Sequence, residues 1–147
     1  MYHHILIPAD GSELAEQAVT HGLSLAKSVG AKVTVIIVEE PMWRGAPSLA
    51  EYGALEELGK YTEQIKNYHA SVLDRAADAA KQAGVPCETI RVKDAKPYQA
   101  IIATAADRGC DLIVMGSHGR SGLSAVVLGS VTNKVLTHTK TPVLVYR

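Results

Sequence analysis

Short apolar runs alternate with amphipathic segments along the whole chain, and this alternation limits the possible folds more than any other feature of the sequence. The runs are rich in β-branched and aliphatic residues, as buried strands are. They cover residues 5–8, 32–38, 86–92, 112–115 and 142–146. Strands separated by helices pair in parallel, with right-handed crossovers that place helices on both faces of the sheet. The sequence therefore predicts a single α/β domain over residues 1–147, a doubly wound, Rossmann-like parallel sheet of five strands.

Capping residues and helical spacing mark the segments between the strands. The first helix can be capped by Asp10 or Ser12, and we expect it to end at Gly30. Two later helices are expected, from Pro97 to about Asp107 and from Ser130 to about His138. The apolar stripe of the first helix comprises Leu14, Ala18, Gly22, Leu25 and Val29.

The longest stripe at helical spacing lies between the second and third strands. Its aromatic and alanine residues favour a helix that faces the core rather than a ligand, ending at Gly84. The stripe comprises Tyr61, Ile65, Tyr68, Val72, Ala76, Ala79 and Ala83.

Periodicity fails from Glu39 to about Gly59, where Pro41 and Pro47 predict a long loop with a short helix near its end. Such a long connection is typical of functional or disordered loops. We expect Trp43 to pack this loop onto the domain, with a lid or a subunit contact as the alternative.

Composition excludes several classes of protein. Fifteen basic and fifteen acidic residues cancel, so neither a nucleic-acid partner nor an anionic membrane surface is indicated. The sequence has no apolar run of about 18 residues and no signal-peptide pattern, which predicts a soluble, cytoplasmic protein without membrane insertion. Cys87 and Cys110 lack metal or redox spacing, and we expect two buried thiols in a reducing compartment. The six histidines lack the spacing of a zinc site.

Glycines follow the fourth strand in an unusual spacing. Gly116 and Gly119 are followed, after nine intervening residues, by Gly129-Ser130, where the last helix is expected to begin with Ser130 as its cap. Glycine permits positive φ and close approach to the backbone. Open amides between a strand end and a helix start bind anions such as phosphate. The spacing is neither a Walker A sequence nor a dinucleotide-binding fingerprint.

The glycine segment also decides between two common strand orders for five strands. In the order 2-1-3-4-5 the ligand crevice lies between strands 1 and 3, and the segment after strand 4 would miss it. In the order 3-2-1-4-5 the crevice lies between strands 1 and 4, so that Pro8-Ala9-Asp10 meets Met115-Gly116. We favour the second order. It separates strands 3 and 4 by roughly 14 Å, too far for Cys87 and Cys110 to form a disulfide.

The spaced motif Gly116, Gly119, Gly129 and Ser130 resembles the signature of ATP-binding universal stress proteins, and the likeness extends over essentially the whole chain. The resemblance implies the same 3-2-1-4-5 order and an ATP ligand, with Mg²⁺ held mainly by phosphates and water. Adenine would lie near Asp10 and Val38, where strands 1 and 2 end. The ribose and phosphates would lie along Met115, Gly116, Gly119, Gly129, Ser130 and Val131.

Residues beside the motif complete the expected site. Pro8 and Ala9 form the tip of strand 1. Arg120 could reach a terminal phosphate through charge-assisted bonds, or lie in solvent. We interpret His118 as a surface residue of the loop rather than a general base.

Three functions fit this site. The first is a nucleotide-dependent regulatory module of the stress response that binds ATP and hydrolyses it slowly at most, with AMP or a cyclic nucleotide still open as the ligand. The second is a phosphoryl-transferring or ATP-hydrolysing enzyme, against which we note that the glycine segment contains no lysine and no placed acidic residue for Mg²⁺. The third is a scaffold with a vestigial site. The resemblance also implies a homodimer that pairs through the exposed edge of the last strand.

Overall fold

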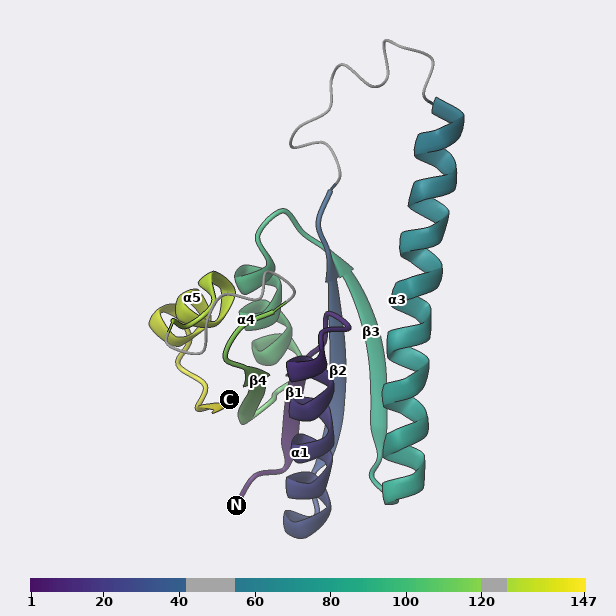
Figure 1. The fold of residues 1–147 in the computed structure, drawn as a ribbon. Helices are drawn as coiled ribbons and strands as arrows, with labels where there is room; N and C mark the ends of the chain where they lie inside the picture. The colour runs from purple at the N-terminus through teal and green to yellow at the C-terminus, as the bar shows by residue number, and fades with distance from the viewer. Residues whose placement is uncertain (42–54, 120–126) are drawn as a thin grey trace.

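A computed structural model describes residues 1–41, 55–119 and 127–147 of the chain. Trp43 and Arg120 lie outside the described residues. Within the described part, the elements in order are β1 (His4–Pro8), α1 (Glu13–Val29), β2 (Lys32–Glu39), α3 (Leu55–Ala83), β3 (Cys87–Lys93), α4 (Pro97–Asp107), β4 (Leu112–Gly116), α5 (Ser130–His138) and β5 (Val143–Tyr146) (Figure 1).

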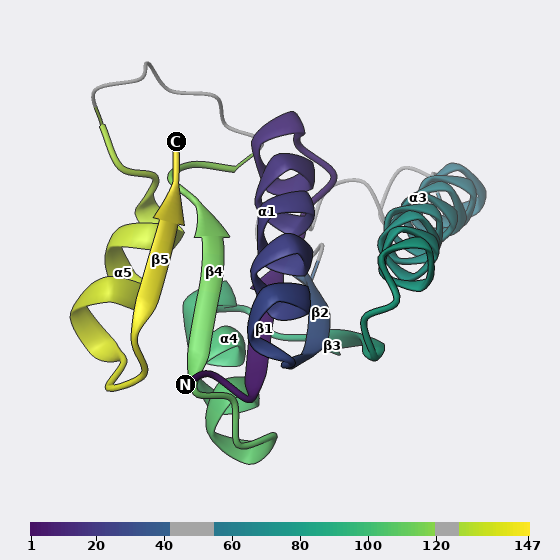
Figure 2. The same cartoon turned by 90° about the horizontal axis from the view of Figure 1, so that it is seen from below.

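The described strands form one parallel sheet with the order β3-β2-β1-β4-β5, which confirms the predicted topology. α1 and α3 cover one face of the sheet, and α4 and α5 cover the other (Figure 2). β1 pairs with β2 on one side and with β4 on the other, so the winding reverses between β1 and β4. The crevice at the carboxyl ends of these strands is where such sheets bind ligands.

The core has two halves because successive strand residues point to opposite faces of the sheet. Ile5 and Ile7 of β1 pack on the α1 and α3 side. Leu6 packs on the other side with Ile101 of α4 and Val135 of α5. All three β1 side chains are 0% exposed. Burial on both faces explains why the strands appear in the sequence as continuous apolar runs.

α1 begins and ends as predicted, but its buried face is turned relative to the predicted stripe. Ser12 caps the helix, and Gly30 ends it with a φ of 71°. Val29, which the stripe included, is 36% exposed. A Cβ on Gly22 would collide with the side chain of Ile7, so the helix lies close against β1 through its small residues. The buried positions are Ala15, Ala18, Val19, Gly22, Leu23 and Ala26.

α3 is longer than the sequence predicted, because it begins at Leu55 and continues through Gly59. Its first half extends past the carboxyl ends of the strands (Figure 1). Its second half packs as expected, with Val72 and Ala76 buried in the core. Tyr61 is 55% exposed, so the core-facing interpretation is wrong at the start of the stripe, whereas Tyr68 is partly buried against the core.

The two cysteines are free thiols, as predicted, but only Cys110 is buried, whereas Cys87 is half-buried. β1 and β2 separate β4 from β3, the strand that carries Cys87. Burial, reinforced by the negative charge of Asp111, raises the pKa of Cys110 to about 11. This thiol therefore stays protonated, and a poor nucleophile, at neutral pH.

His4 is buried at the opposite end of β1 from the ligand crevice, and both of its ring nitrogens are hydrogen-bonded. Nδ1 donates to the carbonyl of Arg108 (3.1 Å), and Nε2 accepts from the hydroxyl of Thr34 (2.8 Å). These roles are those of the neutral ring. Burial and the positive charge of Lys32 lower the pKa of His4.

We expect this histidine to make the fold sensitive to mild acid. The unfolded chain binds the proton more readily than the folded protein, so stability falls as the pH drops below about 6.5, the ordinary histidine value. His4→Gln should cost about 1–3 kcal/mol at pH 8, because buried hydrogen bonds are lost, and should flatten the pH dependence between pH 7 and 5. Urea unfolding across that range measures both. His138→Gln, on an exposed surface, is the matched control. A slope unchanged in His4→Gln would contradict the assignment.

Candidate functional site

A cavity of about 660 Å³ opens at the carboxyl ends of β1, β2 and β4. Its volume is in the range of small-molecule sites. Every site residue expected from the sequence lines it, apart from Arg120, which lies outside the described residues. The residues brought together are Pro8, Ala9, Asp10, Val38, Met115, Gly116, Gly119, Gly129, Ser130 and Val131.

The tips of β1 and β4 meet inside this cavity. A Cβ on Gly119 would collide with Oδ2 of Asp10, so Gly119 lies against the turn that follows β1. The amide of Ala9 donates to the carbonyl of Ile36 (2.8 Å), which ties the same tip to β2. These contacts hold the ends of β1, β2 and β4 around the cavity.

The motif glycines allow neighbouring residues to lie close to the backbone. The positive φ predicted for them is not observed. Positive φ occurs instead at glycines outside the motif, such as Gly11 (79°). A Cβ on Gly116 would lie 3.2 Å from Cγ of Leu14. A Cβ on Gly129 would lie 2.9 Å from Cα of His118. The chain is therefore tightly packed around Gly116, against α1, and around Gly129, against His118, which leaves no room for side chains at these two positions.

α5 begins at Ser130, as predicted, but its N-cap lies one residue earlier than the predicted cap. Gly129 is the N-cap and makes no side-chain cap bond, while Ser130 is the first residue of the helix. The first turn of α5 contains no acidic residue, so the partial positive charge of its amides is not offset there. The Gly129 amide donates to the carbonyl of Ser117 (2.7 Å), and Thr132 Oγ1 donates to the carbonyl of Gly116 (2.9 Å). These two bonds hold the start of α5 against the end of β4.

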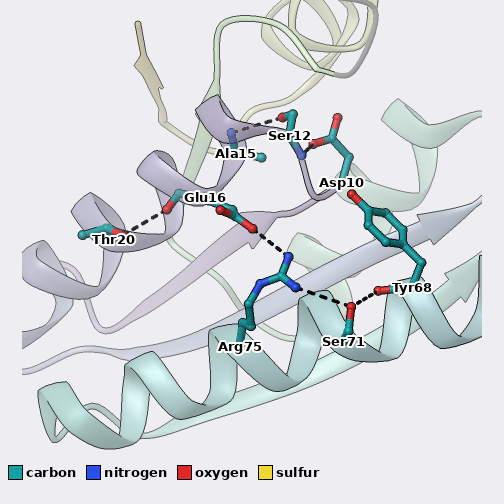
Figure 3. Close-up of polar contacts among 8 residues, drawn as sticks. All are labelled: Asp10, Ser12, Ala15, Glu16, Thr20, Tyr68, Ser71 and Arg75. Atoms are coloured by element: carbon teal, nitrogen blue, oxygen red, sulfur yellow. Dashed lines mark hydrogen bonds and ion pairs between the residues drawn. The ribbon is translucent and has the colours of Figure 1, made fainter.

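Asp10 stabilises the turn between β1 and α1. Its Oδ1 accepts from the amide of Ser12 (2.9 Å), and Ser12 in turn caps α1 by accepting from the amide of Ala15 (3.3 Å). Tyr68 points from α3 toward this turn (Figure 3), where its hydroxyl lies against Gly11. Asp10 thus holds the turn without being the cap itself, and it also lines the cavity.

One wall of the cavity comes from the first half of α3, and the sequence analysis missed it. The largest members of the stripe, Tyr61, Ile65 and Tyr68, line the cavity, although Tyr68 also packs against the core. Val72 and the alanines occupy the part that packs on the sheet. That change in side-chain size along the stripe was the available signal. The α3 residues of the wall are Tyr61, Gln64, Ile65, Tyr68 and His69.

A partly buried ionic group lies behind this wall, where β2 ends. Glu39 Oε1 is 3.2 Å from Nδ1 of His69 and 3.2 Å from Nε of Arg91. Arg91 also donates to the carbonyl of Lys66 (3.3 Å), so the group joins β2, β3 and α3. It fixes the ring of His69 at the edge of the cavity.

The remaining lining is weakly charged. His118 lies half-buried at the cavity, with Nδ1 3.1 Å from the hydroxyl of Ser117. Over the ranges 1–41, 55–119 and 127–147, no three His, Cys, Asp or Glu side chains are grouped as a metal site would require. The described lining includes Asp10 and Glu40 but neither lysine nor arginine. Backbone amides are therefore the main source of positive potential in the described cavity.

These features define a doubly wound α/β domain with a ligand cavity at its topological switch point. The chain matches the universal stress protein family over residues 1–147, and it belongs to that family. Universal stress protein YxiE of Bacillus subtilis is 31% identical over 149 residues, which cover 100% of both chains.

Solved structures give the same result. The structure of MJ0577, a universal stress protein of Methanocaldococcus jannaschii, matches with a TM-score of 0.77 and 34% identity, covering 99% of this chain and 96% of that one. A universal stress protein in complex with cAMP matches with a TM-score of 0.73 and 25% identity, covering 99% and 97%. Among the helices that the structure describes, none combines the length and the apolar character needed to span a bilayer.

Proposed function

We propose that the cavity binds an adenine nucleotide, ATP, and that the protein is a nucleotide-dependent regulatory module of the stress response. The observation that carries this proposal is the meeting of the Asp10 turn, the close-packed glycine segment and the uncapped start of α5 around one cavity. The amides at Ser130 and Val131 offer an anion the positive end of a helix. The cAMP complex of a related protein supports a nucleotide as the ligand.

In this arrangement the phosphates lie over Gly119 and the start of α5, and adenine lies near Val38. Pro8, Ala9 and Met115 provide apolar surface between the two ends of the nucleotide. Mg²⁺ enters with the nucleotide, held mainly by phosphate oxygens and water. AMP or a cyclic nucleotide is the alternative ligand, since backbone amides bind a phosphate group but do not distinguish ligands by their number of phosphates.

We place catalysis second. Phosphoryl transfer needs a positioned metal, a group that orients the nucleophile and stabilisation of the developing charge. The described lining supplies amides, but neither lysine nor a carboxylate cluster, so we propose slow hydrolysis at most. The free thiols Cys87 and Cys110 suit a reducing compartment, and we place the protein in the cytoplasm.

The first test is calorimetric titration with ATP. Gly119→Ala places a methyl group where the Asp10 carboxylate now lies, and we expect it to weaken ATP binding at least tenfold while changing the free energy of unfolding by about 1 kcal/mol or less. The matched control is Gly59→Ala in α3, where the added methyl group meets no atom within 4 Å. We expect this control to keep full affinity. Absence of ATP, AMP and cAMP binding to the wild-type protein would contradict the proposal.

We also propose a homodimer that pairs through β5, the edge strand beside β4. The carbonyls of Pro142 and Tyr146 accept from β4 (2.9 and 2.7 Å). Backbone groups alternate in direction along a parallel strand, so those of Val143 and Val145 point to the open edge. These are the groups that a second β5 would pair with.

Val145→Pro removes one outward N–H and leaves the bonds to β4 intact, since edge strands tolerate proline on their open side. We expect it to shift the dimer toward monomer in sedimentation runs at micromolar concentration. Val145→Thr keeps the N–H and should remain dimeric. A monomeric wild-type protein, or a Val145→Pro variant that dimerises equally well, would rule out this interface.

A further inference from the structure

His69 combines two features among the described residues. It is buried beside Glu39, and it also lines the cavity. The residue is 9% exposed, and it lines the cavity from α3. Its partner Glu39 ends β2, on the opposite side of β1 from the glycine segment. In the nucleotide arrangement proposed above, this is the nucleoside end of the site.

Glu39 decides which ring nitrogen carries the proton. A carboxylate can only accept hydrogen bonds, so Nδ1 of His69 donates to Oε1 (3.2 Å). Arg91 bonds to the same oxygen and holds the carboxylate in place. In the neutral ring, Nε2 is therefore left as an acceptor.

Nε2 keeps some exposure to solvent. Among the described residues, no buried side-chain nitrogen or oxygen lacks a hydrogen-bond partner. The hydrogen bond of the His69 ring in the structure is made through Nδ1. Nε2 is consequently accessible to solvent, and the cavity is the space that His69 lines.

We propose that His69 is a specificity-determining residue whose Nε2 accepts a hydrogen bond from the nucleoside half of the ligand, with Glu39 as its positioning residue. This assignment rests on the proposed nucleotide function. Two groups of an adenine nucleotide have the required chemistry, namely the 6-amino group of the base and a ribose hydroxyl. A 6-oxo base presents an acceptor at that position and cannot supply this bond.

The experiment compares ligands that lack one donor at a time. Wild-type protein and His69→Leu are titrated with ATP, inosine triphosphate, 2′-deoxy-ATP and 3′-deoxy-ATP. We expect His69→Leu to weaken ATP binding about three- to tenfold, the usual effect of one hydrogen bond, and to leave unchanged the affinity for the one analogue that lacks the donor in question. That analogue identifies the base or the ribose as the donor. His138→Leu, the same change on an exposed surface of α5, should alter no affinity.

Glu39→Gln tests the positioning role. A glutamine amide can donate as well as accept, so the ring proton is no longer confined to Nδ1. Nitrogen NMR of the wild-type ring should show the Nδ1–H form and a shift of Nε2 when ATP binds, and Glu39→Gln should populate both forms and discriminate less between the ligands.

Two results would overturn the assignment. In the first, His69→Leu lowers the affinity for all four ligands by the same factor, or changes none of the four affinities. His69 would then have only a structural role. In the second, the wild-type ring is protonated on Nε2 alone. If wild-type protein binds none of the four ligands, the nucleotide function itself fails, and this assignment fails with it.

Discussion

The pairing of β1 with β4 is the constraint on which the rest of the structure depends. Ile5 and Leu6 pair with Leu112 and Ile113, and the amide of Asp111 donates to the carbonyl of His4 (2.9 Å) at the start of the pair. At the other end, the same pairing sets Asp10 against Gly119. This arrangement places the β1 turn, Gly119 and the start of α5 around one cavity.

Much of this could be predicted from the sequence, because the signals are local and repeated. Apolar runs define the strands, and the glycine spacing selects the order in which β1 and β4 are neighbours. The residues at those strand ends follow from that order, which is why the structure brings Pro8 and Met115 to the same cavity. These predictions need only periodicity and the rule that parallel strands end at one edge.

The rest depended on distances that the sequence does not contain. The stripe with Tyr61 has helical spacing along its whole length. This spacing does not indicate that the first half of α3 extends past the sheet. Val29 of α1 has the spacing of the apolar stripe, yet it is 36% exposed, because helical spacing alone does not show which side of a stripe faces the sheet. Likewise, the group of Glu39, His69 and Arg91 comes from three elements, so it becomes visible only after folding.

The central claim is that the amides after β4 bind the charged end of a nucleotide beside the tip of β1. Amide chemical-shift mapping with ATP and with adenosine tests it most directly. The account predicts that both ligands shift the resonances near Val38, and that only ATP shifts the amides of Gly119, Ser130 and Val131. Identical shifts from the two ligands at those amides, or no shifts there with saturating ATP, would contradict it.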